Sequence, residues 1–304
     1  MPILTTTTAP KMAGTILPFR TGDLRSLGLS HGRYIVRPAI TSDEIDAALR
    51  LRFAIFNVEL GEGLAKSFAN GKDEDVFDRQ CEHVILIDRT SRQIVGTCRL
   101  RTYDQAKSHS GFYSSARFNL STLPNRLLEN AVEFGRACIA RGHRNKNSFR
   151  LLWRFLMGYS IQTQKQYLFG CCSLKSQDPL AGGSLYEWLR EAGYTHDEFR
   201  VIPRPGSKCI FYKTAQKSSK VNLPSPLYTY LKRGAKICGL PALDRDFRTI
   251  DFFTLLDLQQ SPVERPQGDM MAGSLRSTVR SAPNLLAERS TPTSHPSQKD
   301  HSTW

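Results

Sequence analysis

The sequence predicts an α/β domain built around one mixed β-sheet, and three observations support this prediction. Between about residues 33 and 258, short apolar runs typical of buried strands alternate with amphipathic runs typical of helices. Two strand-like runs, 83–89 and 93–103, are separated only by the polar residues TSR, which indicates a hairpin. Later strands are joined through helices instead, and such mixed connections imply a mixed sheet.

The first part of this region is expected to hold a strand, a helix and the hairpin. The run YIVRPA at 34–39 is typical of a strand. The segment 42–60 follows and is expected to form a helix, with Ser42 as its N-cap and Ile45 on its apolar face. The two hairpin strands come next.

The second part begins with a strand at 131–140, which precedes a helix at 149–166 whose apolar residues recur on one face. The run YLFGCCSL at 167–174 is typical of a buried strand. The next helix, 183–193, is expected to end at Gly193, because glycine suits a helix C-terminus. The remaining elements are expected to be a strand, a helix and a strand at 208–213, 225–235 and 251–257.

The two ends of the chain differ from the middle in composition. Residues 1–32 are rich in Thr, Pro, Gly and Ser, and residues 259–304 are dense in Ser, Thr and Pro and poor in aromatics. Such segments cannot bury enough apolar surface to offset the entropy lost on ordering. We therefore expect largely disordered ends on either side of one domain at 33–258.

The net charge of +14 predicts attraction to an anionic partner, either nucleic acid, anionic lipid headgroups or an acidic protein. No helix-turn-helix, zinc-finger or RNP pattern is present, so we expect no nucleic-acid partner. No apolar run reaches the roughly 18 residues of a transmembrane helix, and the first residues do not resemble a secretory signal. The seven cysteines contain no CxxC pair, which predicts reduced, buried thiols and no metal site.

The stretch AVEFGRACIARGHRNKNSFRLLW, residues 131–153, combines a strand, a basic loop and a helix start. Helix N-termini bind anions through free N–H groups and the helix dipole, and the basic loop side chains add positive charge. The loop lacks the GxxxxGK[ST] and GxGxxG patterns, so a single phosphate of the pantetheine type suits it better than a nucleotide. A solvated basic turn is the alternative.

Glu133 is unusual because it lies inside the apolar strand. Its carboxylate could face solvent or pair with Arg136, or it could act as a base or bind an ammonium group. Alternation along a strand places residues 133 and 136 on opposite faces unless a bulge intervenes.

Several segments occur together in the order typical of one known family. They are 33–61, 77–88, 94–100, 111–121, 133–140, 149–159, 167–174 and 230–258. Through these segments the chain resembles the ornithine lipid family of N-acyltransferases, also called hemolysin-like GNAT proteins. The resemblance implies a GNAT-like fold (that of acyl-CoA N-acyltransferases), related to acyl-homoserine lactone synthases, with a mixed central sheet flanked by helices.

The activity implied by this resemblance moves a 3-hydroxyacyl chain from acyl carrier protein to the α-amino group of L-ornithine, giving lyso-ornithine lipid. Three positions depart from the family pattern: Arg117 and Asn119 replace acidic residues, and Phe77 replaces a tyrosine. These departures leave open another amino acid acceptor, such as glycine, glutamine, lysine or serine. A synthase of the acyl-homoserine lactone type is a further alternative.

Amide formation from a thioester requires a deprotonated amine and a polarised carbonyl. We expect Glu133 to accept the amine proton, directly or through a water, and backbone N–H groups near 136–138 to stabilise the oxyanion. No side-chain nucleophile is needed, and Cys138 is expected to serve packing. The residues expected to hold the acceptor, with structural ion pairs as the alternative, are Arg52, Asp78, Arg99 and Arg136.

The donor implied by the resemblance is acyl carrier protein with its 4′-phosphopantetheine arm, and no cofactor is expected to stay bound. The residues expected to hold the arm are Arg141, His143, Arg144, Asn145 and Ser148. The helix expected at 225–235 sets apolar residues beside Lys232 and Arg233, as suits an acidic protein or anionic headgroups. The expected location is cytoplasmic, with peripheral contact at the inner face of a bacterial membrane as a further expectation.

Overall fold

The structure is a computed structural model of the chain, and it describes residues 27–211 and 223–260. Most of the two expected disordered ends therefore lies outside the described residues, as do residues 212 and 213 of the strand expected at 208–213.

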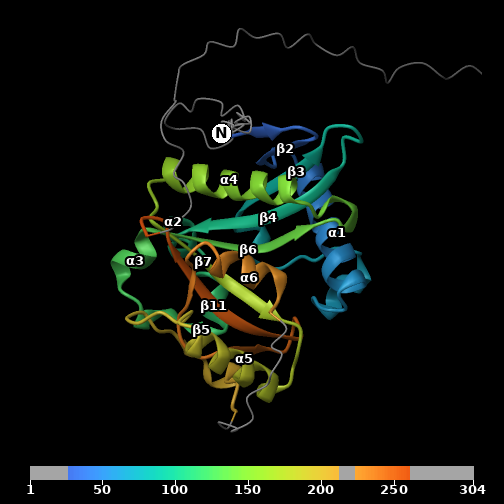
Figure 1. Cartoon of the computed structure of the whole chain (residues 1–304). Coiled ribbons are helices and arrows are strands. Elements are labelled where there is room, and N and C mark those ends of the chain that lie inside the picture. Colours follow the sequence, from blue (N-terminus) through green and yellow to red (C-terminus); the bar gives the residue numbers. More distant parts are fainter. Residues whose placement is uncertain (1–26, 212–222, 261–304) are drawn as a thin grey trace, which may run out of the picture. The chain divides into compact units, whose positions relative to one another are not determined.

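One mixed sheet of nine strands organises the described residues (Figure 1). Its strands, in spatial order, are β1 (Leu29–His31), β2 (Tyr34–Pro38), β3 (Glu82–Asp88), β4 (Ile94–Thr102), β6 (Ala131–Ile139), β7 (Tyr167–Leu174), β11 (Thr249–Asp257) and β10 (Ala242–Asp244), and β9 (Lys236–Ile237) also pairs with β11. Strands β6 and β7 run parallel, whereas the other strand pairs in the described part of the chain are antiparallel. The predicted α/β class with a mixed sheet is confirmed.

Helices flank this sheet, and two short strands form a separate pair. The helices are α1 (Ser42–Phe53), α2 (Tyr103–Lys107), α3 (Asn125–Glu129), α4 (Lys146–Gln162), α5 (Pro179–Glu191) and α6 (Ser225–Leu231). The separate pair is β5 (Phe118–Asn119) with β8 (Ile202–Pro203). Helix α4 lies across the sheet beside β1 and β2 (Figure 1).

The core has two parts because side chains alternate along each strand. Phe252 of β11 belongs to the same buried cluster as Leu151 and Phe155 of α4, whereas its neighbour Phe253 belongs to the second cluster, with Leu127 of α3. Helices α4 and α3 therefore cover opposite faces of the sheet.

Most predicted elements are confirmed within a few residues, but their ends reveal capping that the periodicity did not show. Helix α1 is capped by Thr41, not Ser42, because Thr41 accepts a hydrogen bond from the Glu44 N–H and the Glu44 side chain completes a capping box. The expected helix at 42–60 continues past α1 as one π-helical segment, Ala54–Glu59. Gly193 has a positive φ of 73° just after α5, as a C-terminal glycine should.

Two boundaries were wrong. The N-terminal segment was expected to be largely disordered up to a domain start at residue 33, yet Leu29–His31 forms β1 against β2, and Leu27 and Leu29 are buried in the core. The strand expected at 208–213 is absent from its described residues, 208–211. Only Lys208 makes an isolated bridge, and the Ile210 side chain is exposed instead of packing in the core.

Candidate functional site

A cavity of about 1110 Å³ opens where the two parallel strands separate. Strand β6 pairs with β7 only from Ala131 to Glu133, although both strands continue beyond this point. Gly170 permits the tight contact at the fork, because a Cβ atom there would lie 2.2 Å from the carbonyl oxygen of Phe134. Beyond the fork, the facing edges of β6 and β7 line the cavity and leave room for a ligand between them.

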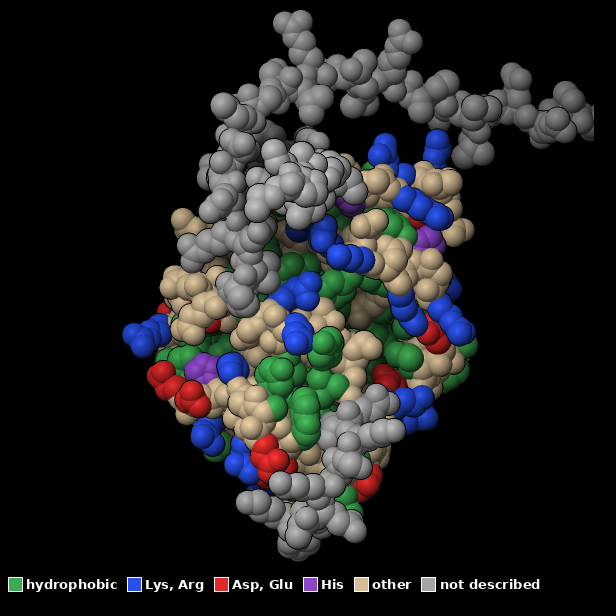
Figure 2. All heavy atoms as spheres, in the orientation of Figure 1, with side chains coloured by type: hydrophobic (Ala, Val, Ile, Leu, Met, Phe, Trp, Pro, Cys, Tyr) green, Lys and Arg blue, Asp and Glu red, His purple; other side chains and the backbone are tan. Residues whose placement is uncertain are grey.

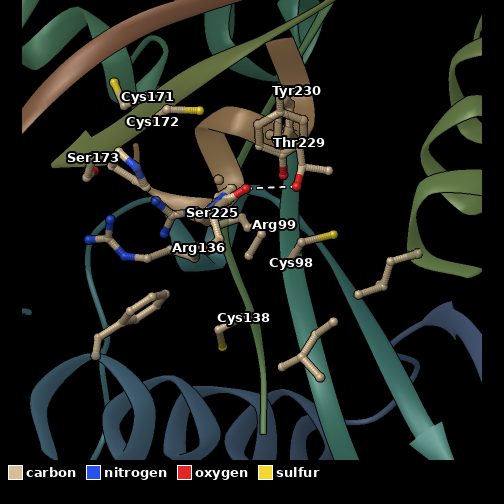
Figure 3. A pocket seen from close by; sticks show the side chains of 18 of the residues that line it. Cys98, Arg99, Arg136, Cys138, Cys171, Cys172, Ser173, Ser225, Thr229 and Tyr230 are labelled. Carbon is tan, nitrogen blue, oxygen red and sulfur yellow. Dashed lines mark hydrogen bonds between the residues drawn. The ribbon is translucent and has the colours of Figure 1, made fainter. Parts of the chain in front are cut away.

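Figure 3 shows side chains that reach this space from β4, β6, β7 and α6. The labelled side chains are Cys98 and Arg99 of β4, Arg136 and Cys138 of β6, Cys171, Cys172 and Ser173 of β7, and Ser225, Thr229 and Tyr230 of α6.

A β-bulge brings Glu133 and Arg136 to the same cavity. Thr97 lies opposite Cys138 and Arg99 lies opposite Gly135, so β6 holds one residue more than β4 over this interval. The backbone of Arg136 takes a positive φ of 51°, which accommodates the extra residue. The alternation that would have separated the two side chains is therefore broken, and both line the cavity.

The Glu133 carboxylate is buried and accepts three hydrogen bonds. Its Oε2 accepts from the Tyr113 N–H at 2.7 Å, and its Oε1 accepts from the Ser114 N–H at 2.7 Å and the Ser114 hydroxyl at 2.6 Å. Burial raises the pKa of Glu133 above its ordinary value, although these donors act against that rise. Since Oε2 has a single donor, it keeps a lone pair for a proton or a water.

Beside Glu133, three arginines and three aspartates form one buried ion network. Its members are Arg52, Arg99, Arg136, Asp73, Asp75 and Asp78. Arg52 binds Asp73 at 2.8 Å and Asp78 at 2.6 Å, and its side chain is 1% exposed. Burial opposes ionisation of Asp78, but the charges of Arg52 and Arg99 outweigh it and hold the pKa of Asp78 well below its ordinary value.

The network separates the predicted acceptor-binding residues into two groups. Arg99 and Arg136 line the cavity, and Arg136 also stacks on Tyr113 and Phe247 with its guanidinium carbon 4.8 and 4.3 Å from the ring centres. Arg52 and Asp78 do not line the cavity; they lie behind these side chains and hold them in place. For Arg52 and Asp78 the geometry matches the structural ion pair that was the alternative.

The loop before α4 is also divided in its roles. Arg144 and Asn145 line the cavity together with Lys146. The Ser148 hydroxyl is buried and donates to the His143 carbonyl oxygen at 2.6 Å, and the Asn145 amide oxygen accepts from the N–H groups of residues 147 and 148. Asn145 therefore caps α4, Ser148 completes the capping box, and Ser148 is not among the lining residues.

His143 and Arg141 lie off the cavity as well. The His143 ring packs edge-on against Tyr34 with 5.9 Å between the ring centres, and Arg141 is an exposed residue that is not part of the lining. Arg144 has an ion pair of its own, with its two terminal nitrogens 2.5 and 2.8 Å from the Glu59 carboxylate oxygens.

The end of the cavity under α4 and α6 is apolar. Its large side chains are Phe134, Phe149, Leu152, Trp153, Leu156 and Tyr230. The ring of Tyr230 meets that of Phe134 edge-on, with 5.1 Å between the centres. This part of the cavity suits a hydrocarbon chain.

Two charged residues of the cavity that sequence reasoning missed are Arg101 and Asp251. Arg101 is 1% exposed and makes no ion pair with any described residue; its N–H groups reach Gln80 and the carbonyl oxygen of Gln105. The signal for Arg101 and Asp251 was present, since each is a charged residue inside an apolar strand run, as Glu133 is.

Five cysteines line the cavity, and none is placed for nucleophilic chemistry. They are Cys81, Cys98, Cys138, Cys171 and Cys172. Burial raises the pKa of the Cys138 thiol to about 12, so little thiolate forms at neutral pH. All seven cysteines are free thiols, and the described residues hold no cluster of three or more side chains able to bind a metal ion.

In the described part of the chain, no helix has the length and apolar character needed to span a bilayer.

The chain is similar to several known proteins. Residues 51–154 match the family described as acetyltransferase (GNAT) domain. The chain is 31% identical over 249 residues to an L-ornithine N(alpha)-acyltransferase of Brucella abortus (strain 2308), covering 77% of this chain and 86% of that protein. It is 30% identical over 238 residues to the protein of the same name from Rhodobacter capsulatus, covering 74% and 90%. A solved N-acyl amino acid synthase from uncultured soil microbes is similar at a TM-score of 0.44 and 11% identity, over 75% of this chain and 92% of that one.

Proposed function

Since this chain belongs to the family of the L-ornithine N(alpha)-acyltransferases and is an N-acyltransferase with a GNAT fold, we propose that it acylates the α-amino group of L-ornithine. The proposed donor is a 3-hydroxyacyl chain on acyl carrier protein, and the proposed product is lyso-ornithine lipid. One observation carries the proposal: a single cavity joins a basic entrance, an open strand edge, an apolar end and a buried carboxylate.

The entrance suits the phosphate of a pantetheine arm. Lys146 and Arg150, on the first turns of α4, line the cavity beside Arg144. Positive side chains at a helix N-terminus attract a phosphate group. The arm would then run along β6 between 134 and 138, where this strand has left β7 and its backbone groups can pair with the amides of pantetheine.

The apolar end would take the fatty chain, which places the thioester carbonyl near the bulge of β6. Backbone N–H groups at 136–138 would stabilise the oxyanion that forms when the amine attacks. Glu133 would accept the amine proton through the free lone pair of Oε2, directly or through a water. The thiolate of the carrier leaves, and no acyl-enzyme forms.

Arg101 is the proposed partner of the acceptor's α-carboxylate. It is buried, lines the cavity and has no acidic partner among the described residues, whereas Arg99 and Arg136 share three aspartates. It also lies opposite Glu133 in the β4–β6 register. The α-carboxylate of one acceptor molecule could therefore bind Arg101 while its α-amine lies at Glu133.

The positive charge of the chain supports the carrier as donor. On the face of the molecule that Figure 2 shows, Lys and Arg side chains lie around hydrophobic ones. Arg150 and Lys175 are among the residues that line the cavity. Acyl carrier proteins are acidic, so complementary charge would steer their approach. The same charge supports peripheral contact with an anionic membrane at the inner face, which would take up the lipid product.

The test is transfer by the purified chain. Incubation with 3-hydroxyacyl carrier protein and L-ornithine should consume the thioester, release the carrier thiol and give Nα-acylornithine by mass spectrometry. The same acyl group on coenzyme A serves as the control for the donor and should react more slowly. A product formed with glycine, glutamine, lysine or serine but not with ornithine would refute the acceptor. A lactone formed from S-adenosylmethionine would refute the reaction.

A further inference from the structure

Two carboxylates at the cavity, Asp251 and Glu62, have no cationic partner within ion-pair distance among the described residues. Asp251 of β11 is 2% exposed, and both of its hydrogen bonds go to one oxygen: Oδ1 accepts from the Ser173 hydroxyl at 2.8 Å and from the Thr249 hydroxyl at 3.0 Å. No described residue donates a hydrogen bond to its Oδ2. This oxygen is not among the fully buried polar atoms that lack a partner, so we place it facing the cavity that Asp251 lines. Glu62 lines the same cavity, and its side chain accepts no hydrogen bond from the described part of the chain.

The neighbouring Asp244 shows the contrast. Its Oδ1 accepts from Arg117 at 2.7 Å and from two backbone N–H groups, and its Oδ2 accepts from the Tyr113 hydroxyl at 3.1 Å. Asp244 is therefore satisfied within the fold. Asp251 and Glu62 are not, and they are close enough that the charge of Asp251, after burial, helps to raise the pKa of Glu62.

A buried carboxylate without a counter-charge is costly unless a ligand supplies one. Lys175 supplies it only in part: its charge opposes the rise in the pKa of Glu62, but its ammonium group donates to the Leu60 carbonyl oxygen and makes no ion pair with a described carboxylate. Burial, together with the charge of Asp244, raises the pKa of Asp251 to about 6, as expected for a group that lacks a cation. Two carboxylates with free oxygens in the lining of one cavity suit an ammonium group, which has three donors.

We propose that Asp251 and Glu62 bind the side-chain ammonium of a diamino acid and so select the acceptor, an inference that rests on the proposed function. After burial, the negative charges of Asp251 and Glu133 both help to raise the pKa of the Cys171 thiol, so the two carboxylates border the same part of the cavity. An acceptor with its α-amine at Glu133 can extend its side chain along β7 toward Asp251.

The test compares L-ornithine with L-2-aminopentanoate, which has the same carbon chain without the terminal amine. The native chain should favour ornithine by about 100-fold or more in kcat/KM, because a site built for a polar group rejects the analogue that lacks it. Asp251→Asn and Glu62→Gln should each reduce this preference by about tenfold or more. Asp246→Asn is the matched control; its carboxylate is 76% exposed and lies outside the cavity, so the preference should persist.

The outcomes separate the inference from the proposed function. Transfer to both amines with no preference in the native chain overturns the ammonium site and leaves the acyltransferase intact. Equal losses of kcat/KM for both acceptors in Asp251→Asn and Glu62→Gln also overturn it, since that pattern indicates proton transfer or a structural role. Failure of the native chain to transfer to any amino acid refutes the proposed function itself.

Discussion

Replacing Asp251 by asparagine should stabilise the fold while it impairs selection of the acceptor. Asparagine has almost the same shape, and its amide oxygen can accept the two hydroxyl hydrogen bonds that Oδ1 accepts from Ser173 and Thr249. The substitution removes only the charge. A residue kept for packing would not show opposite effects on stability and activity, but a residue kept for binding would.

The size of the effect follows from the pKa of Asp251. Burial first, and the negative charge of Asp244 second, raise it from 3.8 to about 6. A pKa raised by about two units corresponds to about 3 kcal/mol, because one unit is worth about 1.4 kcal/mol. The other titratable or charged groups that influence Asp251, or are influenced by it, are Glu62, Tyr113, Arg117, Cys171 and Cys172.

The stability difference between Asp251→Asn and the native chain depends on pH. Below about pH 4 the native Asp251 is protonated in both the folded and the unfolded chain, so the variant should gain nothing. As pH rises through 6, the folded chain must release a proton that it holds more tightly than the unfolded chain does, and stability falls. The advantage of Asp251→Asn should therefore grow between pH 4 and 6 and reach about 3 kcal/mol at pH 7.5, or about 6–12 °C in Tm.

The assay is urea denaturation of the native chain and the variant at pH 4, 5, 6 and 7.5, with the free energy of unfolding as the readout. Asp246→Asn removes an exposed charge and should give parallel curves. A variant less stable than the native chain at pH 7.5 would refute the reasoning. So would a stability difference that stays constant from pH 4 to 7.5.

Three further substitutions test the surroundings of the cavity. Glu133→Gln should slow transfer at least about 100-fold and also cost about 1–3 kcal/mol in urea denaturation, because its NH2 group meets a backbone N–H where the native carboxylate oxygen accepted one; full turnover would remove Glu133 from the mechanism. Asp78→Asn removes a carboxylate that two buried arginines share and should cost about 3–5 kcal/mol, while the KM for ornithine in the folded fraction stays near native; a raised KM with native stability would instead make Asp78 a binding residue. Gly170→Ala puts a methyl group against the Phe134 carbonyl oxygen and should lower Tm and thioester consumption together; native values of both would show that the fork can relax.

The fold could be predicted largely from the sequence because strand and helix periodicity is local. The run at 167–174 coincides with β7 to the residue. The bulge at Arg136 could not be predicted, because it depends on the register between β6 and β4, and the sequence of either strand alone does not determine that register. The need for glycine at position 170 likewise could not be predicted, because it arises from the close approach of the Phe134 carbonyl group on the neighbouring strand.

The candidate site was predicted in part, for similar reasons. Glu133 could be singled out because a carboxylate in an apolar strand is conspicuous. Asp251 has the same signal in the run TIDFFTLLD but was included only as the first residue of an expected strand. The network partners Asp73 and Asp75 lie in the acidic segment KDEDVFDRQ, which resembles an exposed loop until Arg52 of α1 is seen beside it.

The departure at Arg117 bears directly on the choice of acceptor. An arginine in place of an acidic residue suggests a weaker attraction for a cationic side chain, and for that reason the acceptor was left open. In the structure, however, Arg117 binds Asp244 at 2.7 Å and Asp246 at 3.2 Å, and makes no ion pair with Asp251. Its charge is thus matched by carboxylates outside the proposed ammonium site. Arg117→Ala should therefore loosen the loop around Asp244 and lower stability, yet leave the preference for ornithine over 2-aminopentanoate above about tenfold; loss of that preference with native stability would show that Arg117 itself selects the acceptor.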